Sequence, residues 1–230
     1  MDIVGHRGAC GHAPENTLKS FRKAIELGCQ RAELDVRVSK DGVPVVIHDP
    51  NVERTTNGRG DVKELTLSEL KQLDAGDLEQ IPTLLEVMEL CRGRIDLQID
   101  LKDPNSPIPV AELIRSHWEP ASSVITSFDL ALISEFGRLM PLVPRGLLNR
   151  KANLDMVVVA QEHGHRWICP RSDIVVQELV QKAHAAALRV YVYHVNDRKL
   201  AQKLISWRVD AIGTDDPAML SELLSRDKRS

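Results

Sequence analysis

Aromatic residues, net charge and long apolar runs are all scarce in this sequence. Only 3% of its 230 residues are aromatic, and 30 Lys and Arg nearly balance 33 Asp and Glu. A chain with no basic run and few aromatic platforms for base stacking lacks the features with which proteins bind nucleic acid. No stretch reaches the roughly 18 apolar residues that a membrane-spanning helix needs. The composition argues against nucleic acid and against stable membrane insertion, and it leaves a small or anionic solute as the expected partner.

Cysteine is equally sparse, and no targeting segment is recognisable. The four cysteines, Cys10, Cys29, Cys91 and Cys169, form no CxxC pair and adjoin no histidine cluster. We therefore expect buried, reduced thiols and no zinc site. The start MDIVGHRG has neither the charged nor the apolar segment of a signal peptide. We expect a cytoplasmic protein, and nothing in the sequence indicates an oligomeric state.

The length and the lack of linkers predict one domain. A chain of 230 residues that is 43% hydrophobic can bury a large core. The polar stretch 49–61 is the one candidate boundary, and it is too short to be more than a loop. We expect a single domain over residues 1–230.

A short β-prone run followed by a helical pattern recurs along the chain. The β-prone runs are 2–5, 31–39, 94–101, 122–126, 142–148, 166–169, 189–195 and 210–213, with helical patterns such as 15–27, 83–91, 173–187 and 217–224 between them. Eight such repeats predict a closed (β/α)₈ or TIM barrel, and the length suits that α/β fold. The alternative is an open doubly wound sheet, although no Gly-rich dinucleotide fingerprint follows the first strand.

A further β-prone run, 43–48, follows the second predicted strand after the turn Lys40-Asp41-Gly42. Two β-runs joined by a turn containing Asp-Gly predict a hairpin, so this run should return antiparallel beside the second strand. In a simple ladder the residue numbers of facing positions then sum to about 81 or 82. This register places His48 opposite Glu33 or Leu34.

Two predicted strands alternate polar and apolar residues. Glu33 and Asp35 share the polar face of run 31–39, and Asp100 lies near the end of run 94–101. Alternation alone is equally typical of an antiparallel sheet with one solvated face. In a barrel, however, the polar face points into the lumen, where carboxylates must be paired or bind a metal. Three converging carboxylates would repel one another, and oxygen ligands without cysteine suit Mg²⁺ or Ca²⁺.

Two histidines are expected at the same rim of the barrel. His6 ends the first predicted strand, and the hairpin register brings His48 to the face where barrel active sites lie. Two imidazoles can act as general base and general acid. Arg7 and Lys102 supply cations that suit a phosphate group. Each of these cations could also form salt bridges with the carboxylates, which does not exclude the functional role.

The motifs that carry these residues form a recognisable series. In chain order they are HRGACGHAPENT, AELDVRVSKDGVPVVIHD, RTTNGRGDVKELTLSEL, IPTLLEV, IDLQIDLK, TSF, YVYHVND and VDAIGTDDP. With these motifs the chain resembles, over essentially its whole length, the glycerophosphodiester phosphodiesterase family. The resemblance implies a (β/α)₈ barrel of the PLC-like phosphodiesterase type. It also implies metal-dependent hydrolysis of glycerophosphodiesters to sn-glycerol 3-phosphate and an alcohol.

The resemblance also implies a role for each matched position. By motif, the catalytic histidines are His6 and His48, the phosphate-contacting arginine is Arg7, two metal-binding carboxylates are Glu33 and Asp35, the lysine after the third carboxylate is Lys102, and a second-shell residue at the edge of the site is Glu15.

Two positions depart from the family pattern. Asp100 stands where the family usually has Glu, so the third metal ligand is one methylene shorter. Tyr193 and His194 replace the first residues of a WTVN run. We expect Tyr193 to form an aromatic wall for the glycerol or alcohol group, and His194 to be a core or rim histidine. The remaining histidines are expected to be solvated side chains: His12, His117, His163, His165 and His184.

The expected reaction is general acid and base catalysis by His6 and His48 beside a metal held by Glu33, Asp35 and Asp100. The attacking group is either water or the 2-hydroxyl of the substrate's glycerol, and the sequence favours neither. No serine or cysteine lies in a nucleophile elbow, so no covalent enzyme intermediate is expected. Two other readings stay open: a lysophospholipase D, and a catalytically weak barrel that binds phosphodiesters.

Overall fold

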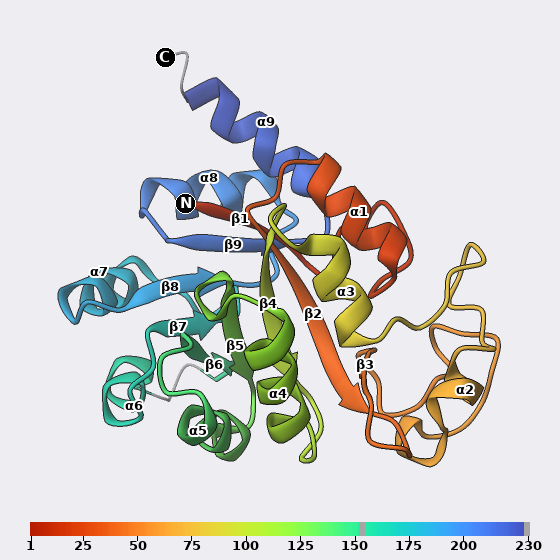
Figure 1. The fold of residues 1–230 in the computed structure, drawn as a ribbon. Helices are drawn as coiled ribbons and strands as arrows, with labels where there is room; N and C mark the ends of the chain where they lie inside the picture. Colours follow the sequence, from red (N-terminus) through yellow and green to blue (C-terminus); the bar gives the residue numbers. More distant parts are fainter. Residues whose placement is uncertain (152–154, 228–230) are drawn as a thin grey trace.

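The computed structural model describes residues 1–151 and 155–227 and shows a closed barrel (Figure 1). Within these residues eight parallel strands form the ring: β1 (Asp2–Gly5), β2 (Arg31–Val38), β4 (Asp96–Leu101), β5 (Ser123–Ser127), β6 (Arg145–Asn149), β7 (Trp167–Pro170), β8 (Arg189–Val192) and β9 (Ala211–Thr214). β1 pairs with β2 on one side and with β9 on the other, which closes the ring. The predicted (β/α)₈ barrel is confirmed, and the open doubly wound sheet is wrong.

Helices follow the strands and pack around the outside of the ring (Figure 1). They are α1 (Leu18–Glu26), α3 (Leu84–Cys91), α4 (Pro107–His117), α5 (Leu130–Leu139), α6 (Met156–Glu162), α7 (Gln177–Ala185), α8 (Arg198–Ser206) and α9 (Pro217–Asp227). A short 3₁₀ turn, η2 (Pro120–Ser122), leads into β5. No helix in the described ranges is long and apolar enough to cross a membrane.

The first helix begins later than its sequence pattern predicts. The pattern starts at Glu15, but α1 begins at Leu18, because Thr17 is extended and its side chain accepts a hydrogen bond from the Ser20 amide. Asn16 has a φ of 57°, in the left-handed region that a helix cannot include. The residues of the PEN motif therefore form a turn at the mouth of the barrel, and this turn keeps Glu15 and Asn16 free for other contacts.

The predicted hairpin is present and has the expected register. Strand β3 (Pro44–Val46) pairs antiparallel with β2, with Val36 opposite Val46 and Val38 opposite Pro44, so that the facing numbers sum to 82. The prediction that His48 lies opposite Glu33 or Leu34 is wrong.

The edge of β2 beside Glu33 is already occupied by the turn after β1. The Gly8 amide donates to the Glu33 carbonyl over 3.0 Å, and the last ladder contact of the hairpin is the Ile47 amide on the Asp35 carbonyl. The chain therefore bends away after Ile47. The His48 carbonyl accepts from Arg37 Nε over 2.8 Å instead of joining the sheet.

The segment between β3 and α3, residues 47–83, forms a lobe beside the barrel (Figure 1). It contains η1 (Val62–Glu64) and α2 (Leu67–Leu70) and, together with Val45 of β3, forms an apolar cluster separate from the main core. That cluster consists of Val45, Ile47, Val52, Val62, Leu70, Ala75 and Ile81. Burial of these side chains fixes a polar loop, which the sequence suggested only as a connection, against the mouth of the barrel.

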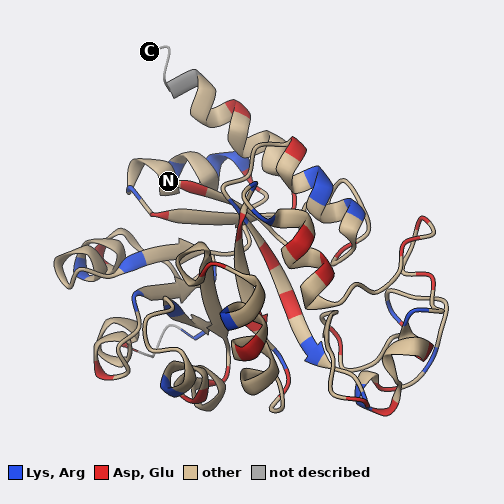
Figure 2. Ribbon diagram, viewed as in Figure 1, with Lys and Arg blue, Asp and Glu red and all other residues tan. Residues whose placement is uncertain are grey.

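Alternation along β2 separates the apolar core from the lumen. Ala32, Leu34 and Val36 are fully buried in the large cluster between strands and helices. Glu33 and Asp35 point to the other side and are 5% and 1% exposed. Charged residues therefore interrupt the long central strand β2 (Figure 2). The expectation of carboxylates inside the barrel is confirmed.

Two groups of side chains differ from the expected burial. All four cysteines are free, but only Cys29, Cys91 and Cys169 are buried, whereas Cys10 is half-buried. His165 was expected to be solvated but is only 4% exposed, because the turn after α6 brings it to a small cavity between α6 and strands β6 and β7. Among the described residues neither ring nitrogen of His165 has a hydrogen-bond partner. Burial and the nearby charge of Arg145 lower the pKa of His165 to about 4.

The buried imidazole predicts an acid-sensitive fold. Below pH 6.5 the unfolded chain protonates this histidine while the folded protein does not, so stability falls between about pH 6.5 and pH 4. His165→Leu should remove on the order of 2 kcal/mol of that loss. Urea unfolding at pH 7.5 and pH 5 measures it, with His117→Leu, at the exposed histidine that ends α4, as control. Equal acid sensitivity of the wild type and His165→Leu would contradict the assignment.

Candidate active site

The predicted functional residues meet at the carboxyl ends of the strands. A pocket with about 380 Å³ of empty space opens there, and eight of the residues expected from the sequence line it: His6, Arg7, Glu33, Asp35, His48, Asp100, Lys102 and Tyr193. The ninth, Glu15, does not line this pocket and instead contacts Arg7 from the PEN turn. The active sites of TIM-barrel enzymes lie at this end of the barrel, in concave pockets with several converging polar groups.

Three carboxylates form the floor of the pocket. Asp35 and Asp100 are register partners on the parallel neighbours β2 and β4, and Glu33 lies two residues before Asp35 on the same face. One oxygen from each carboxylate lies within 4.8 Å of the others. Asp100 Oδ1 is buried without a partner among the described residues, while Glu33 Oε2 accepts from the Arg7 amide over 2.9 Å. Buried carboxylates with unused oxygens are the donor set that a hard divalent cation takes.

The environment pushes the pKa values of these carboxyl groups apart. Burial and the neighbouring charge of Asp35 raise the pKa of Glu33 to about 7. Burial also raises the pKa of Asp100 to about 6, although Lys102 opposes this shift. Burial would raise the pKa of Asp35 too, but the charges of Lys102 and Arg7 lower it to about 2. In the metal-free protein only Asp35 is therefore ionised without cost near neutral pH.

Two cations compensate Asp35. Arg7 Nε lies 3.2 Å from its Oδ2, and Lys102 Nζ lies 3.2 Å from its Oδ1 and also contacts Asp100. Asn16 Nδ2 donates to Asp35 Oδ2 over 2.9 Å. The backbone of Arg7 is left-handed, with a φ of 49°, and this turn directs its side chain inward. The next residue, Gly8, has a φ of 84° and packs so tightly that a Cβ there would lie 2.3 Å from Ser20 Oγ. The HRG turn thus requires glycine after the arginine.

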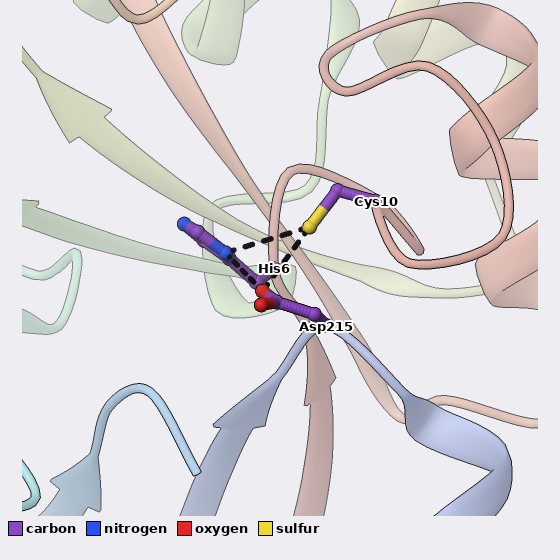
Figure 3. Close-up of side chains that lie close together, drawn as sticks. All are labelled: His6, Cys10 and Asp215. Atoms are coloured by element: carbon purple, nitrogen blue, oxygen red, sulfur yellow. Dashed lines mark hydrogen bonds and ion pairs between the residues drawn. The ribbon is translucent and has the colours of Figure 1, made fainter. Parts of the chain in front are cut away.

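His6 is held by Asp215, the carboxylate that directly follows β9, the last strand of the barrel. Its Nδ1 lies 2.6 Å from Asp215 Oδ1, and the Cys10 thiol donates to the same oxygen over 3.1 Å (Figure 3). The hydrogen bond from His6 lowers the pKa of Asp215. A carboxylate on Nδ1 fixes the tautomer of a neutral imidazole that leaves Nε2 as a proton acceptor. That nitrogen points away from Asp215 (Figure 3), and the ring lines the pocket.

His48, in the segment after β3, has the same arrangement. Its Nδ1 lies 2.6 Å from Asp49 Oδ1, and Arg54 Nε donates to Asp49 Oδ2 over 2.6 Å. Burial lowers the pKa of His48, and the positive charges of Arg7 and Lys102 lower it further. The carboxylates of Asp35 and Asp49 oppose this shift. Both predicted histidines are therefore oriented imidazoles, each with a carboxylate behind it.

Arg54 ties the lobe to the barrel. Its guanidinium donates to both oxygens of Glu15 over 2.9 and 2.8 Å, while Glu15 also accepts from Arg7 Nη1 over 2.6 Å. Asp49, Arg54 and Asp215 were not assigned from the sequence, although the HD, RTTNG and GTDDP motifs contain them. These three residues act on the site through other side chains, which a motif alone does not reveal.

An aromatic wall stands opposite the first two strands. Tyr193 is 4% exposed, its hydroxyl donates to the Asn149 carbonyl over 3.1 Å, and its ring meets Phe128 edge to face at 6.0 Å. His194 lies against His6 with 3.5 Å between ring centroids. Burial and the nearby His6 lower the pKa of His194 to about 3, which keeps the ring neutral. The structure thus places His194 in the pocket lining, with its ring packed at a tilt against His6.

Comparison with known proteins gives one consistent family. The model of the Glycerophosphoryl diester phosphodiesterase family matches residues 6–219. The chain is 33% identical over 237 residues to a glycerophosphodiester phosphodiesterase of Caldanaerobacter subterraneus subsp. tengcongensis, covering 97% of this chain and 98% of the relative. It is 31% identical over 233 residues to one of Bacillus altitudinis, covering 94% of each.

Solved structures agree with this similarity. A phosphodiesterase of Oleispira antarctica in complex with the product sn-glycerol-3-phosphate superposes with a TM-score of 0.93 at 30% identity, covering 98% of this chain and 97% of the other. A glycerophosphodiester phosphodiesterase of Agrobacterium tumefaciens superposes with a TM-score of 0.86 at 31% identity, covering 96% and 99%.

The carboxylate floor predicts a pH-dependent role for Lys102 in stability. Lys102→Met removes the cation that Asp35 and Asp100 share, so the pKa values of both carboxyl groups rise. The free-energy cost of keeping these groups ionised in the folded protein then increases as the pH rises above about 5. We expect the metal-free variant to lose about 3 kcal/mol of unfolding free energy at pH 8 and less at pH 5. Urea unfolding in chelator measures this loss. The control Lys182→Met removes an exposed ion pair with Asp155 and should change the stability little at either pH. A loss that grows as the pH falls would contradict the account.

Proposed function

Because the chain belongs to the glycerophosphoryl diester phosphodiesterase family and is a hydrolase of that class, we propose that it cleaves glycerophosphodiesters to sn-glycerol 3-phosphate and an alcohol. The observation that carries this proposal is the convergence of two carboxylate-backed imidazoles on one pocket floored by three carboxylates. The product sn-glycerol-3-phosphate in the Oleispira antarctica structure supports the substrate class. We further propose that residues 1–230 act as a single domain in the cytoplasm, where the four free thiols stay reduced.

Glu33, Asp35 and Asp100 would hold a divalent metal, Mg²⁺ or Ca²⁺. The partnerless Asp100 oxygen and the raised pKa values of Glu33 and Asp100 support this role, since a bound cation offsets the repulsion among the three groups. When bound, a hard cation supplies Lewis acidity at a phosphate oxygen. Asp100, one methylene shorter than the usual Glu, lies beside Asp35 as its register partner on the neighbouring strand.

The two histidines would move the protons. With Nδ1 bound to Asp215 or Asp49, a neutral ring accepts a proton at Nε2 and a protonated ring donates one from the same atom. One ring, His6 or His48, takes the proton of the attacking hydroxyl, which belongs to water or to the substrate's own glycerol. The other ring protonates the departing alcohol. The carboxylate behind each ring stabilises its imidazolium form.

The cations would bind the phosphate, and no side chain would attack it. Arg7 and Lys102 contact the floor at the point where negative charge grows in the transition state, which is where fixed positive charge lowers the barrier most. Cys10, the thiol nearest His6, is kept protonated because burial and Asp215 raise its pKa. We propose that no covalent enzyme intermediate forms, and a phosphoenzyme trapped during turnover would contradict this.

The acid and base roles predict the effect of two substitutions. His6→Ala and His48→Ala should each lower kcat for release of glycerol 3-phosphate by about 10² to 10⁴ while the fold stays intact. Circular dichroism checks that each variant is folded. The control is His163→Ala, which changes an exposed histidine just after α6 and should keep full activity. Release of product from a lysophospholipid faster than from glycerophosphodiesters would favour the lysophospholipase D reading. Binding of a diester without any turnover would favour the binding barrel.

The metal site has a test that does not depend on turnover. Titration of the chelator-treated protein with Mg²⁺, and separately with Ca²⁺, should raise its Tm, and Asp100→Asn should lower the affinity about tenfold or more because one charged ligand is lost. Asp173→Asn, which alters an exposed carboxylate outside the pocket, is the matched control. If Asp100→Asn binds either ion as tightly as the control does, the floor is not the metal site. Catalysis that survives complete chelation would contradict metal dependence.

A further inference from the structure

Arg150 is a cation of the pocket without an acidic partner. It follows β6 directly, lines the pocket and is exposed, and no described residue forms an ion pair with it. The other two cations differ in this respect, since Arg7 is paired with Glu15 and Asp35 and Lys102 with Asp35 and Asp100. The positive charge of Arg150 is thus available to whatever occupies the pocket.

The position of Arg150 places it beside one of the two alcohol groups, or arms, of a diester bound in the pocket. In the ring order, β6 is the strand opposite β1, so Arg150 stands across the mouth from His6 and Arg7. A diester whose phosphate sits over the carboxylate floor has two arms, and the side of the pocket formed by residues after β5, β6 and β8 is where one arm can extend. Phe128 after β5 and Tyr193 after β8 form this wall together with Arg150.

The aromatic face that could attract a cationic head group is already occupied. The Arg150 guanidinium carbon lies 4.0 Å from the centroid of the Phe128 ring, and Lys102 Nζ lies 5.2 Å from it. Aromatic walls bind quaternary ammonium groups through the negative face of the ring. Here two protein cations already lie against the Phe128 ring, so a cationic head group beside it would meet positive charge.

We propose that Arg150 makes the enzyme select head groups by charge, favouring glycerophosphodiesters whose second alcohol is neutral or anionic over those carrying choline. This inference rests on the proposed function, because it assigns the second arm of the same substrate. Two like charges a few ångströms apart at a partly solvated site repel enough to change kcat/KM by about tenfold.

A matched pair of substrates isolates the charge. Glycerophosphocholine and its 3,3-dimethylbutyl analogue have head groups of the same shape, but a carbon replaces the ammonium nitrogen of choline in the analogue. The wild type should prefer the neutral analogue in kcat/KM by about tenfold. Arg150→Gln should shrink this ratio severalfold, Arg150→Glu should shrink it further, and Arg150→Lys should restore it. Arg138→Gln, an exposed arginine on the outer helix α5, is the control and should leave the ratio unchanged.

The outcomes separate this inference from the proposed function. If neither diester releases glycerol 3-phosphate, the proposed function fails. If both are cleaved and the ratio is the same in the wild type, Arg150→Gln and Arg150→Glu, the enzyme stands and charge selection by Arg150 is wrong. An equal fall of kcat/KM for both substrates in Arg150→Gln would also overturn the inference, since Arg150 would then contact the shared glycerophosphate part.

Discussion

The architecture of the site depends on the burial of three carboxylates at the mouth of the barrel. Asp35 and Asp100 lie side by side on β2 and β4, with Glu33 beside them, so that three buried acidic groups share one small volume. Isolated charges cannot be buried cheaply, and Arg7 and Lys102 fully compensate only Asp35. The remaining cost is what makes the floor a strong candidate for a divalent cation.

The surrounding residues extend this compensation outward as a chain of alternating charges. Arg7 connects the floor to Glu15, Arg54 connects Glu15 to Asp49, and Asp49 orients His48. The same contacts that neutralise the buried carboxylates therefore also fix the position of an imidazole and attach the lobe to the barrel. One network of hydrogen bonds and ion pairs thus stabilises the fold and orients a proposed catalytic histidine. Substitution of Arg54 would remove contacts that position both His48, through Asp49, and Arg7, through Glu15.

Local pattern was enough to predict the parts of this site that lie on regular strands. The period of two along β2 and β4 placed Glu33, Asp35 and Asp100 in the lumen, and the turn before β3 gave the correct hairpin register. The prediction failed for His48, where the turn after β1 occupies the edge of β2. The pairing of His6 with Asp215 spans 209 positions in the chain and follows only from closure of the ring. No sequence pattern of period two or 3.6 contains that information.

Proton release on metal binding tests the account most directly. Glu33, with a pKa of about 7, and Asp100, with a pKa of about 6, must lose their protons before they can coordinate a cation. Calorimetric titration of Mg²⁺ or Ca²⁺ at pH 6.5, in buffers of different ionisation enthalpy, counts the protons released. The account predicts that protons leave with the bound ion at pH 6.5 and that almost none leave at pH 9. Binding with no proton release at pH 6.5 would contradict it.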